Sequence, residues 1–313
     1  MQLSDRIGRR LKLQDLHILM TVVQAGSMKK AAALLNTSQP AVSRSVADLE
    51  QAIGVLLLDR RSHGVEPTEY GRALLTHSAA AFDELNEGVK KIEFLADPTA
   101  GEVRIGSTAF LAASFVSAVV DRLSRRHPRI VFNIMTGTSA GMHRELVGRN
   151  LDLLIMRRFG TAHDKQTEFE FLFDDSFVIA AGAENPLARR RKIELADLVN
   201  EPWVLPPGEG EVASVAIEVF RRSGLNVPRA VAVAVAPELR MSLLAPGRFL
   251  SIFPSSVLKF PPKRPDIKIL PVKVPVPRAP IGIVTSKDRT LSPVARLFIE
   301  DAREVAKPLR RRK

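Results

Sequence analysis

The residues best suited to chemistry open one predicted helix, which begins near Ser38. Ser38 is a good helix cap, and Pro40 fits the first turn because a proline there loses no hydrogen bond. Gln39, Ser43 and Arg44 lie about one turn apart and share the outer face of the helix start. A helix that enters the major groove of DNA presents its first turns to the base edges. These five side chains therefore form a candidate base-reading set.

Each side chain of this set has a defined chemistry toward DNA. Arg44 can bond guanine through O6 and N7, Gln39 can pair with adenine or bond a phosphate, and Ser43 can bond a base or the backbone. Pro40 can touch a thymine methyl group, while Ser38 and the free N–H groups of the helix start suit a phosphate. The alternative is an ordinary amphipathic helix with a polar outer face, and these residues alone leave that alternative open.

A second group of polar side chains follows two predicted strands in the later part of the chain. Ser107 and Thr108 come after the first of these strands, and Thr136, Thr138 and Ser139 come after the next. A strand end that leads into a helix N-terminus is a natural cradle for an anion or a carboxylate. Simple helix capping is the alternative for both loops. The hydroxyl groups are therefore candidate ligands for a small molecule.

Ser139 also lies in a G-x-S-x-G motif over residues 137–141, which is typical of the nucleophile elbow of serine hydrolases. That fold needs an acidic residue and then a histidine after the serine. The only later histidines are His143 and His163, both close to the serine in sequence. A serine hydrolase is therefore a disfavoured hypothesis.

A glycine-rich stretch over residues 208–213 matches G-x-G-x-x-A. It follows a predicted strand that ends at Leu205, but two prolines intervene and its two glutamates would repel a pyrophosphate. The stretch therefore predicts an exposed loop, or a wall of a small-molecule pocket that includes Leu205, in place of a dinucleotide site. The six histidines show no metal-ligand spacing, so no metal site is predicted.

Composition limits the class of protein. The 313 residues are 45% hydrophobic and 26% charged, which suits a soluble globular chain of two or three domains. No apolar run approaches the length of a membrane span, the N-terminus has no apolar signal core, and there is no cysteine. An integral helical membrane protein and thiol chemistry are thus excluded, and a cytoplasmic location is expected.

The net charge of +12 suggests a nucleic-acid partner. However, residues 1–95 are nearly balanced in charge, and the excess lies in clusters further on, such as residues 189–192 and 310–313. Basic clusters of this kind are usually solvated faces or tails. The case for DNA therefore rests on the candidate base-reading set and not on net charge.

The first 95 residues are predicted to be almost wholly helical. The spacing of apolar residues predicts helices over 13–25, 29–35 and 39–53. The short turn between the second and third helices makes a helix-turn-helix, and the candidate base-reading set lies on its second helix.

Two short extended pieces follow, around a turn at Gly64, and they predict a β-wing that ends near Pro67. Arg60 and Arg61 flank this wing, and we expect them to lie over phosphates or in the minor groove. Arg60 could equally pair with Asp59 or another carboxylate.

A long helix is predicted from Thr68 to about Leu95. Its apolar residues repeat at spacings of seven, three, four and three, which is the pattern of a helix–helix seam. The seam can pack against its own domain or against the same helix of a second subunit, and we expect a role in dimerisation. The seam residues are Leu75, Phe82, Leu85, Val89 and Ile92.

Beyond a hinge at residues 97–101, strands alternate with helices such as 110–126, 142–148 and 293–305. This alternation predicts an α/β region with mainly parallel sheets. The predicted strands are 102–106, 130–135, 151–156, 177–181, 203–205, 230–235, 249–253 and 281–285.

Residues 13–71 together resemble the N-terminal domain of the LysR-type transcriptional regulators. The departures are mild, since Leu19 and Leu58 stand where the family often has phenylalanine and Pro67 stands where it often has leucine. The α/β remainder is similar to the effector-binding region of the same family, through looser motifs such as 127–128, 150–153 and 252–254. The residues that carry the N-terminal resemblance are Gly26, Ser27, Ala31, Ala32, Leu35, Ser38, Gln39, Pro40, Ala41, Val42, Ser43, Leu49, Glu50, Gly54, Leu58, Arg60, Thr68 and Gly71.

The resemblance implies an α/β fold class with three parts. These are a winged helix-turn-helix DNA-binding domain at 1–67, a linker and dimerisation helix at 68–97, and an effector domain at 98–313 that resembles periplasmic binding proteins. Within the effector domain, one subdomain would comprise about 98–173 and 276–306, and the other about 174–275. The chain would cross between them near 173–177 and 271–280.

The resemblance also implies a function: a cytoplasmic regulator that binds double-stranded DNA and a small-molecule effector, as a homodimer or homotetramer, and that is not an enzyme. In the family, the loop that matches residues 136–139 lines the effector cleft. No cofactor is expected, and the hydroxyl groups favour an effector that carries carboxylates or hydroxyls. A solute-binding protein without DNA function is the alternative, disfavoured by the complete helix-turn-helix.

Overall fold

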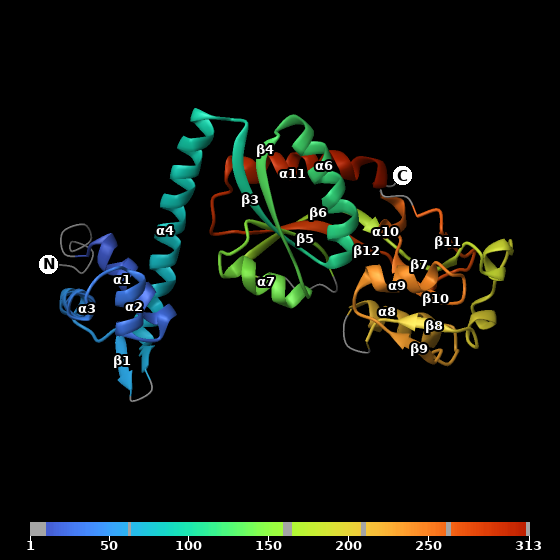
Figure 1. Cartoon of the computed structure of the whole chain (residues 1–313), viewed down its shortest axis with the longest axis horizontal. Helices are drawn as coiled ribbons and strands as arrows, with labels where there is room; N and C mark the ends of the chain where they lie inside the picture. Colours follow the sequence, from blue (N-terminus) through green and yellow to red (C-terminus); the bar gives the residue numbers. More distant parts are fainter. Residues whose placement is uncertain (1–10, 62–63, 159–164, 208–210, 261–263, 311–313) are drawn as a thin grey trace. The chain divides into compact units, whose positions relative to one another are not determined.

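The computed structural model describes residues 11–61, 64–158, 165–207, 211–260 and 264–310. The chain forms two compact units that divide after Gly88, within one long helix (Figure 1). Each unit has its own hydrophobic core.

The first unit is a small helical domain with a two-stranded wing. Gly26, at φ 65°, ends the first helix in the left-handed conformation that glycine adopts without steric cost. Leu19, Val22, Val46 and Leu49 are fully buried in the core of this unit. The elements are α1 Leu13–Ala25, α2 Met28–Leu34, α3 Gln39–Ile53, β1 Leu58–Arg61, β2 Gly64–Pro67 and the first part of α4 Glu69–Ala96.

The first subdomain of the second unit is a five-stranded sheet in the order β4-β3-β5-β12-β6, with helices on both faces (Figure 1). Its strands are β3 Ala100–Ser107, β4 Arg129–Thr136, β5 Leu153–Arg157, β6 Thr167–Asp175 and β12 Ala279–Ser286. Its helices are α5 Ala109–Leu111, continued by a π-helical turn at Ala112–Val116 into α6 Ser117–Arg126, then α7 Ser139–Val147, α11 Pro293–Ala306 and a 3₁₀ turn at Lys307–Leu309.

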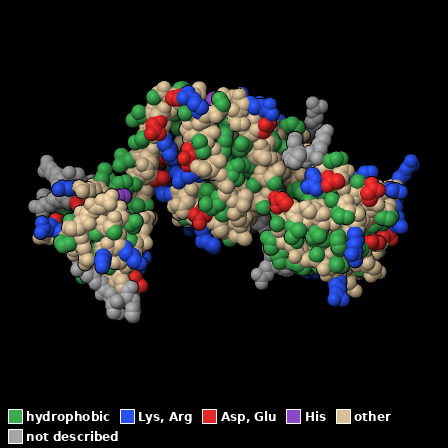
Figure 2. All heavy atoms as spheres, in the orientation of Figure 1, with side chains coloured by type: hydrophobic (Ala, Val, Ile, Leu, Met, Phe, Trp, Pro, Cys, Tyr) green, Lys and Arg blue, Asp and Glu red, His purple; other side chains and the backbone are tan. Residues whose placement is uncertain are grey.

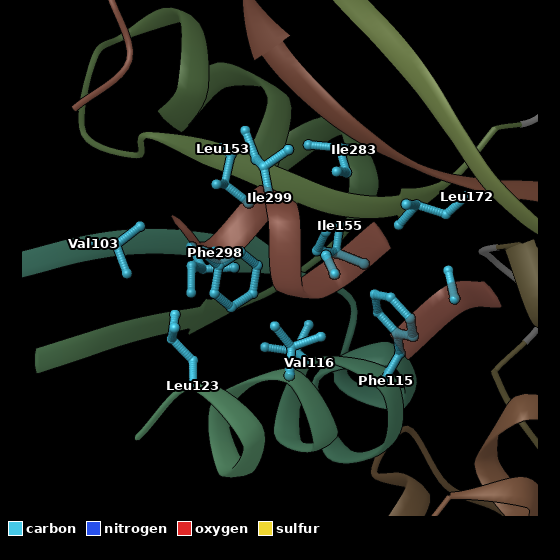
Figure 3. Close-up of a cluster of buried hydrophobic side chains, with 14 of the residues drawn as sticks. Val103, Phe115, Val116, Leu123, Leu153, Ile155, Leu172, Ile283, Phe298 and Ile299 are labelled. Carbon is cyan, nitrogen blue, oxygen red and sulfur yellow. The ribbon is translucent and has the colours of Figure 1, made fainter. Parts of the chain in front are cut away.

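The core of the first subdomain lies between its sheet and two helices. Figure 3 shows Val103 and Ile155 from the strands facing Leu123 of α6 and Phe298 of α11. Helix α7 packs on the opposite face of the sheet through Leu146 and its neighbours. The strands β5 and β12 are therefore mostly buried, whereas β4 at the edge of the sheet is largely exposed.

The second subdomain is another five-stranded sheet, in the order β11-β7-β10-β8-β9. Trp203 on β8 is fully buried, and its indole N–H donates to the carbonyl of Leu198 at 2.7 Å. The strands are β7 Phe177–Gly182, β8 Trp203–Leu205, β9 Ala230–Val233, β10 Leu250–Pro254 and β11 Ile267–Ile269. The helices are α8 Glu211–Arg222, α9 Pro237–Leu244 and α10 Ser256–Lys259, with 3₁₀ turns at Pro186–Arg189 and Leu195–Leu198.

The expectation of mainly parallel sheets is wrong, because both sheets are mixed. In the first sheet β3 pairs parallel with β4 and β5, but β12 pairs antiparallel with β5 and β6. In the second sheet β7 pairs antiparallel with β10 and β11. The antiparallel strands flank the two places where the chain passes between subdomains, after β6 and after β11. Consecutive strands at these places belong to different sheets, so no helical crossover joins them and requires parallel pairing.

Candidate nucleic-acid interface and ligand site

The start of α3 carries the candidate base-reading set on its outer side. Ser38 caps the helix, and its Oγ accepts a hydrogen bond from the amide three residues on, at 3.4 Å. Gln39, Pro40 and Arg44 are exposed, and Ser43 is half-buried. Within the described part of the chain Arg44 makes no ion pair or hydrogen bond, so its guanidinium can face a ligand. The outward edge of this helix start is polar, uncovered and already capped.

Two side-chain contacts fix α3 against the rest of the first unit. The Ser45 hydroxyl donates to Asp15 Oδ1 on α1 at 2.6 Å. Glu50 Oε1 accepts hydrogen bonds from the amides of Leu57 and Leu58, at 2.7 and 3.2 Å. From the sequence, Glu50 was expected only as a position of the family pattern, since a glutamate near a helix end is usually solvated. Its carboxylate instead anchors the segment that leads into the wing.

The predicted wing is present as an antiparallel hairpin in which Arg60 pairs with Val65. A β-carbon at Gly71 would lie 2.0 Å from the carbonyl oxygen of Leu57, so only glycine lets α4 start this close to the wing. The side chains of Arg60 and Arg61 lie outside the part of the chain that the structure describes.

The structure divides the proposed seam of α4 into two parts. Leu75 packs against the core of the first unit, and the ring of Phe82 lies 5.9 Å from that of His17 on α1. Leu85, Val89 and Ile92 are 51%, 53% and 68% exposed. Packing against its own domain therefore accounts for the first two residues, and the last three remain open to a partner.

The two hydroxyl loops lie next to each other at the carboxyl ends of β3 and β4. Ser107 and Thr136 are opposite each other in the parallel register, and the Gly137 amide donates to the Ser107 carbonyl at 3.2 Å. The adjacency follows from the parallel pairing, because the carboxyl ends of neighbouring parallel strands meet at one sheet edge.

The hydroxyl groups of these loops differ in what they already contact. Ser107 is buried and donates to the Ile155 carbonyl at 2.8 Å, and Thr138 caps α7 by accepting from the Gly141 amide at 3.1 Å. Thr136 is exposed, while Thr108 and Ser139 are half-buried. Helix capping thus accounts for one hydrogen bond of the Thr138 hydroxyl. The Thr136 hydroxyl does not cap a helix.

Leu205 lies apart from the hydroxyl loops, at the end of β8 in the second subdomain. Its side chain is buried in the core that also contains Trp203 and Phe220. The glycines at 208 and 210, which prompted its inclusion in a pocket wall, lie outside the described residues.

Arg240 on α9 is a buried cation with no carboxylate partner among the described residues. Its guanidinium carbon lies 4.8 Å from the ring centre of Phe110 and 4.9 Å from that of Phe253. Its Nη1 donates to Ser251 Oγ at 3.4 Å and to the Ile252 carbonyl at 3.2 Å. Burial lowers the pKa of Arg240 to about 10, because desolvation penalises the charged form.

Arg240 links the two subdomains near the first hydroxyl loop. Phe110, which stacks on its guanidinium, comes three residues after Ser107 and packs in the same apolar cluster as Phe253 of β10. Among the described atoms, Nε and Nη2 of Arg240 have no hydrogen-bond partner. A buried polar group in this state demands an explanation, and an anion that completes its hydrogen bonds is one. The sequence gives no signal for Arg240, since an arginine on a short helix is ordinarily exposed.

A second buried cation, Arg157, is fully paired where the chain leaves the first subdomain. Its Nη2 donates to Asp175 Oδ2 at 2.7 Å, and both side chains are at most 6% exposed. The hydroxyls of Ser255 and Ser256 also donate to Asp175, at 2.8 and 2.7 Å. Asp175 ends β6, directly before the first crossing, and the two serines belong to the second subdomain. The network therefore holds the crossing segment to both subdomains.

Charge and metal-binding groups are spread out over the described chain. Lysine and arginine side chains, blue in Figure 2, are scattered over the visible face without forming one large patch.

Among the described residues no three histidine, cysteine, aspartate or glutamate side chains lie close enough to hold a metal ion. No described helix is both long and apolar enough to cross a membrane.

Two family profiles match the chain. The profile described as bacterial regulatory helix-turn-helix protein, lysR family, matches residues 13–72. The profile described as LysR substrate binding domain matches residues 96–307. Together they cover most of the sequence and coincide with the helix-turn-helix and the two α/β subdomains.

Relatives with matching architecture extend over nearly the whole chain. The HTH-type transcriptional regulator GbpR of Azospirillum brasilense is 28% identical over 304 residues, which are 97% of this chain and 89% of the relative. The transcriptional dual regulator GltC of Bacillus subtilis is 26% identical over 290 residues, which are 93% of this chain and 96% of the relative.

Solved structures share the fold at lower identity. A full-length OxyR variant from Pseudomonas aeruginosa has a TM-score of 0.66 at 20% identity, over 97% of this chain and 99% of that one. Full-length CbnR in complex with its target DNA has a TM-score of 0.54 at 22% identity, over 95% and 100% of the two chains. These likenesses confirm the arrangement of a helix-turn-helix, a long helix and an α/β region like that of periplasmic binding proteins.

The matches decide between the alternatives that the sequence left open. A solute-binding protein without DNA function does not explain the N-terminal match, and the G-x-S-x-G motif around Ser139 lies in a binding domain of regulators that are not enzymes. The chain belongs to the LysR family of DNA-binding transcriptional regulators that carry an effector-binding domain.

Proposed function

We propose that this regulator reads double-stranded DNA with the first turns of α3. Gln39, Pro40, Ser43 and Arg44 would contact bases in the major groove, and Ser38 with the helix N-terminus would bind a phosphate. The observation that carries this proposal is the exposure of Arg44 on a helix start that is capped and braced against α1 and the wing. A rigid scaffold of this kind lets side chains reach base edges without reordering the domain.

The wing completes the proposed interface. Its hairpin places Arg60 and Arg61 on β1, within the same small unit as α3. Arginine side chains in such a position suit phosphates or the minor groove, so we propose that they supply salt-dependent affinity and not base preference.

Selection from a pool of random DNA duplexes tests this function. The full-length protein should enrich one sequence motif, and the double variant Gln39→Ala/Arg44→Ala should enrich none. The matched control is Arg190→Ala/Arg191→Ala, which removes two exposed arginine side chains of the second subdomain. Loss of enrichment in both double variants, or in neither, would show that the start of α3 does not read bases.

We also propose that a small effector binds between the two subdomains, against the hydroxyl loops. Ser107, Thr108, Thr136, Thr138 and Ser139 come from two adjacent strand ends. The guanidinium of Arg240, two of whose nitrogens have no hydrogen-bond partner among the described atoms, lies 4.8 Å from the ring centre of Phe110, which follows the first of these loops. These groups favour an effector that carries a carboxylate, with hydroxyls as further partners. Leu205 packs in the core of the second subdomain. It would therefore affect effector binding only indirectly, by holding β8 in place.

Binding of the effector can be tested without knowing its identity. Thermal-shift screening against matched pairs of small carboxylates and their amides should yield stabilisation by carboxylates alone, about 2.7 kcal/mol at 100 times the dissociation constant. Thr136→Ala should lose that response, because this exposed hydroxyl has no capping role, whereas Thr138→Ser keeps the α7 cap and should retain it. Equal responses of both variants to the hit compound would place the effector elsewhere.

The oligomeric form and the location are further parts of the proposal. We propose that Leu85, Val89 and Ile92 of α4 are covered by the same helix of a second subunit, giving a homodimer or a homotetramer built from dimers. A protein that binds chromosomal DNA of a bacterium acts in the cytoplasm, and we propose that location here.

A further inference from the structure

A basic hollow lies where the two subdomains are joined, and it is distinct from the hydroxyl loops. Its volume is about 680 Å³. We call this hollow the hinge pocket. Its charged lining residues come from the end of β6, from α10, from the segment before β12 and from the turn after α11. The charged residues are Asp174, Asp175, Lys259, Arg278, Lys307 and Arg310.

The four cations of the hinge pocket outweigh its two acids, and one of these acids is already neutralised. Asp175 accepts hydrogen bonds from Arg157 and from the two serines that open α10. Asp174 is exposed at the rim. The pocket therefore keeps a positive excess that nothing in its own lining cancels.

Most of the cations are not committed to carboxylates. Arg310 donates to the carbonyl of Leu172 at 2.9 Å, and this bond leaves its charge uncompensated. Lys307 pairs with Glu304 at 2.6 Å. In the part of the chain that the structure describes, Lys259 and Arg278 have neither an ion pair nor a hydrogen bond through their side chains.

We propose that the hinge pocket binds a small anion with two or more negative charges, such as a diphosphate or a tricarboxylate. Pockets for small molecules usually enclose about 300–1,000 Å³, so a volume of this order suits a metabolite and is far too small for duplex DNA. Arginine forks match phosphate and carboxylate groups, and lysine adds point charge. The site shares no residue with the hydroxyl loops or with Arg240.

The anion would contact both subdomains at once. Lys259 belongs to α10 of the second subdomain, and Arg310 follows α11 of the first. Arg278 lies in the second crossing segment, directly before β12, and Asp174 lies just before the first. A ligand that binds one relative arrangement of the subdomains more tightly shifts the protein toward that arrangement. The hinge pocket would thus act as a second, anionic input to the same regulator.

Titration calorimetry of the full-length protein with sodium pyrophosphate and, separately, with sodium citrate tests this proposal. The titrations use about 0.1 M salt, which screens diffuse surface charge over roughly 10 Å. At least one anion should bind with one site per chain, and comparison of the two identifies phosphate or carboxylate as the preferred group. Arg278→Ser and Lys259→Ser should each weaken binding about ten-fold, the usual effect of losing one charge-assisted hydrogen bond.

Two controls make the result decisive. Arg191→Ser removes an exposed arginine outside the pocket lining and should leave the affinity unchanged. Melting temperatures without ligand show whether each variant is folded. Absence of binding by both anions, or equal weakening by Arg191→Ser and Arg278→Ser, would overturn the proposal. Weakening by Thr136→Ala but not by Arg278→Ser would overturn it too, since the anion would then occupy the effector site. DNA binding by α3 is measured separately and does not depend on these outcomes.

Discussion

Replacing Asp175 with asparagine should destabilise the effector domain strongly. The change removes a carboxylate that pairs with Arg157 and accepts hydrogen bonds from Ser255 and Ser256, and the side chains of Asp175 and Arg157 are 1% and 6% exposed. Breaking a buried ion pair by removing one partner costs about 3–5 kcal/mol, because the attraction that offset desolvation of the other charge is lost. In a domain of this size each kcal/mol lowers the melting temperature by about 2–4 °C, so we expect a drop of roughly 6–20 °C.

Thermal denaturation followed by circular dichroism provides the measurement, and an exposed pair provides the control. Asp121 pairs with Arg125 at 3.0 Å on α6, where the side chains are 66% and 75% exposed. Asp121→Asn should cost at most about 1 kcal/mol, since solvent screens such a pair. Asp175→Leu combined with Arg157→Met should recover part of the loss, because no buried charge then remains. If Asp175→Asn melts within a few degrees of Asp121→Asn, the reasoning about this network is refuted.

Three further outcomes are expected. Glu50→Ala should lower the free energy of unfolding by about 1–3 kcal/mol, because the amides of Leu57 and Leu58 lose their acceptor. Urea denaturation measures this loss, and an unchanged midpoint would contradict the contact. Val89→Asp with Ile92→Asp should give monomers by light scattering, because these exposed apolar side chains would become charged; an unchanged mass would remove α4 as the dimer contact. Burial raises the pKa of Asp152, but hydrogen bonds from Arg104 and the positive charges of Arg104 and Arg289 lower it more. The pKa of Asp152 therefore lies below its ordinary value. That stabilisation is complete above pH 3.8 and is lost as pH falls through the lowered pKa, so Asp152→Asn should weaken the acid dependence of unfolding.

The N-terminal unit could be predicted from sequence because its signals are local. A cap at Ser38, an apolar period and a stop at Gly54 specify α3 without any knowledge of its neighbours. The strand β6, at Thr167–Asp175, was missed because its buried and exposed residues do not alternate regularly along the strand. The pairing of β12 with β5 and β6 makes the first sheet mixed, the pairing of β7 with β10 and β11 makes the second sheet mixed, and no single segment carries that information.

The candidate sites were predictable to different degrees for the same reason. Parallel pairing of β3 and β4 brings the two hydroxyl loops together, as the strand-end argument expected. The burial of Arg240 depends on Phe110 from another subdomain, and the hinge pocket depends on Arg278 and Lys259, which are nearly twenty residues apart. Such tertiary contacts leave no periodic or motif signal. The sequence did not show which residues of the α4 seam pack within their own unit, because the contact of Phe82 with His17 on α1 is also a tertiary contact.

The most direct test of DNA reading by α3 is the base preference of Arg44→Ala, measured by competition binding. The selected duplex and its single-base variants are compared between the wild type and the variant, with Arg191→Ala as the matched control. We expect the variant to lose about 1–3 kcal/mol of binding free energy on the selected duplex and to lose discrimination at one base pair per half-site, with the other positions unchanged. Uniform weakening at all positions would identify Arg44 as a phosphate contact, and unchanged affinity and preference would contradict the assignment of α3 as the DNA-reading helix.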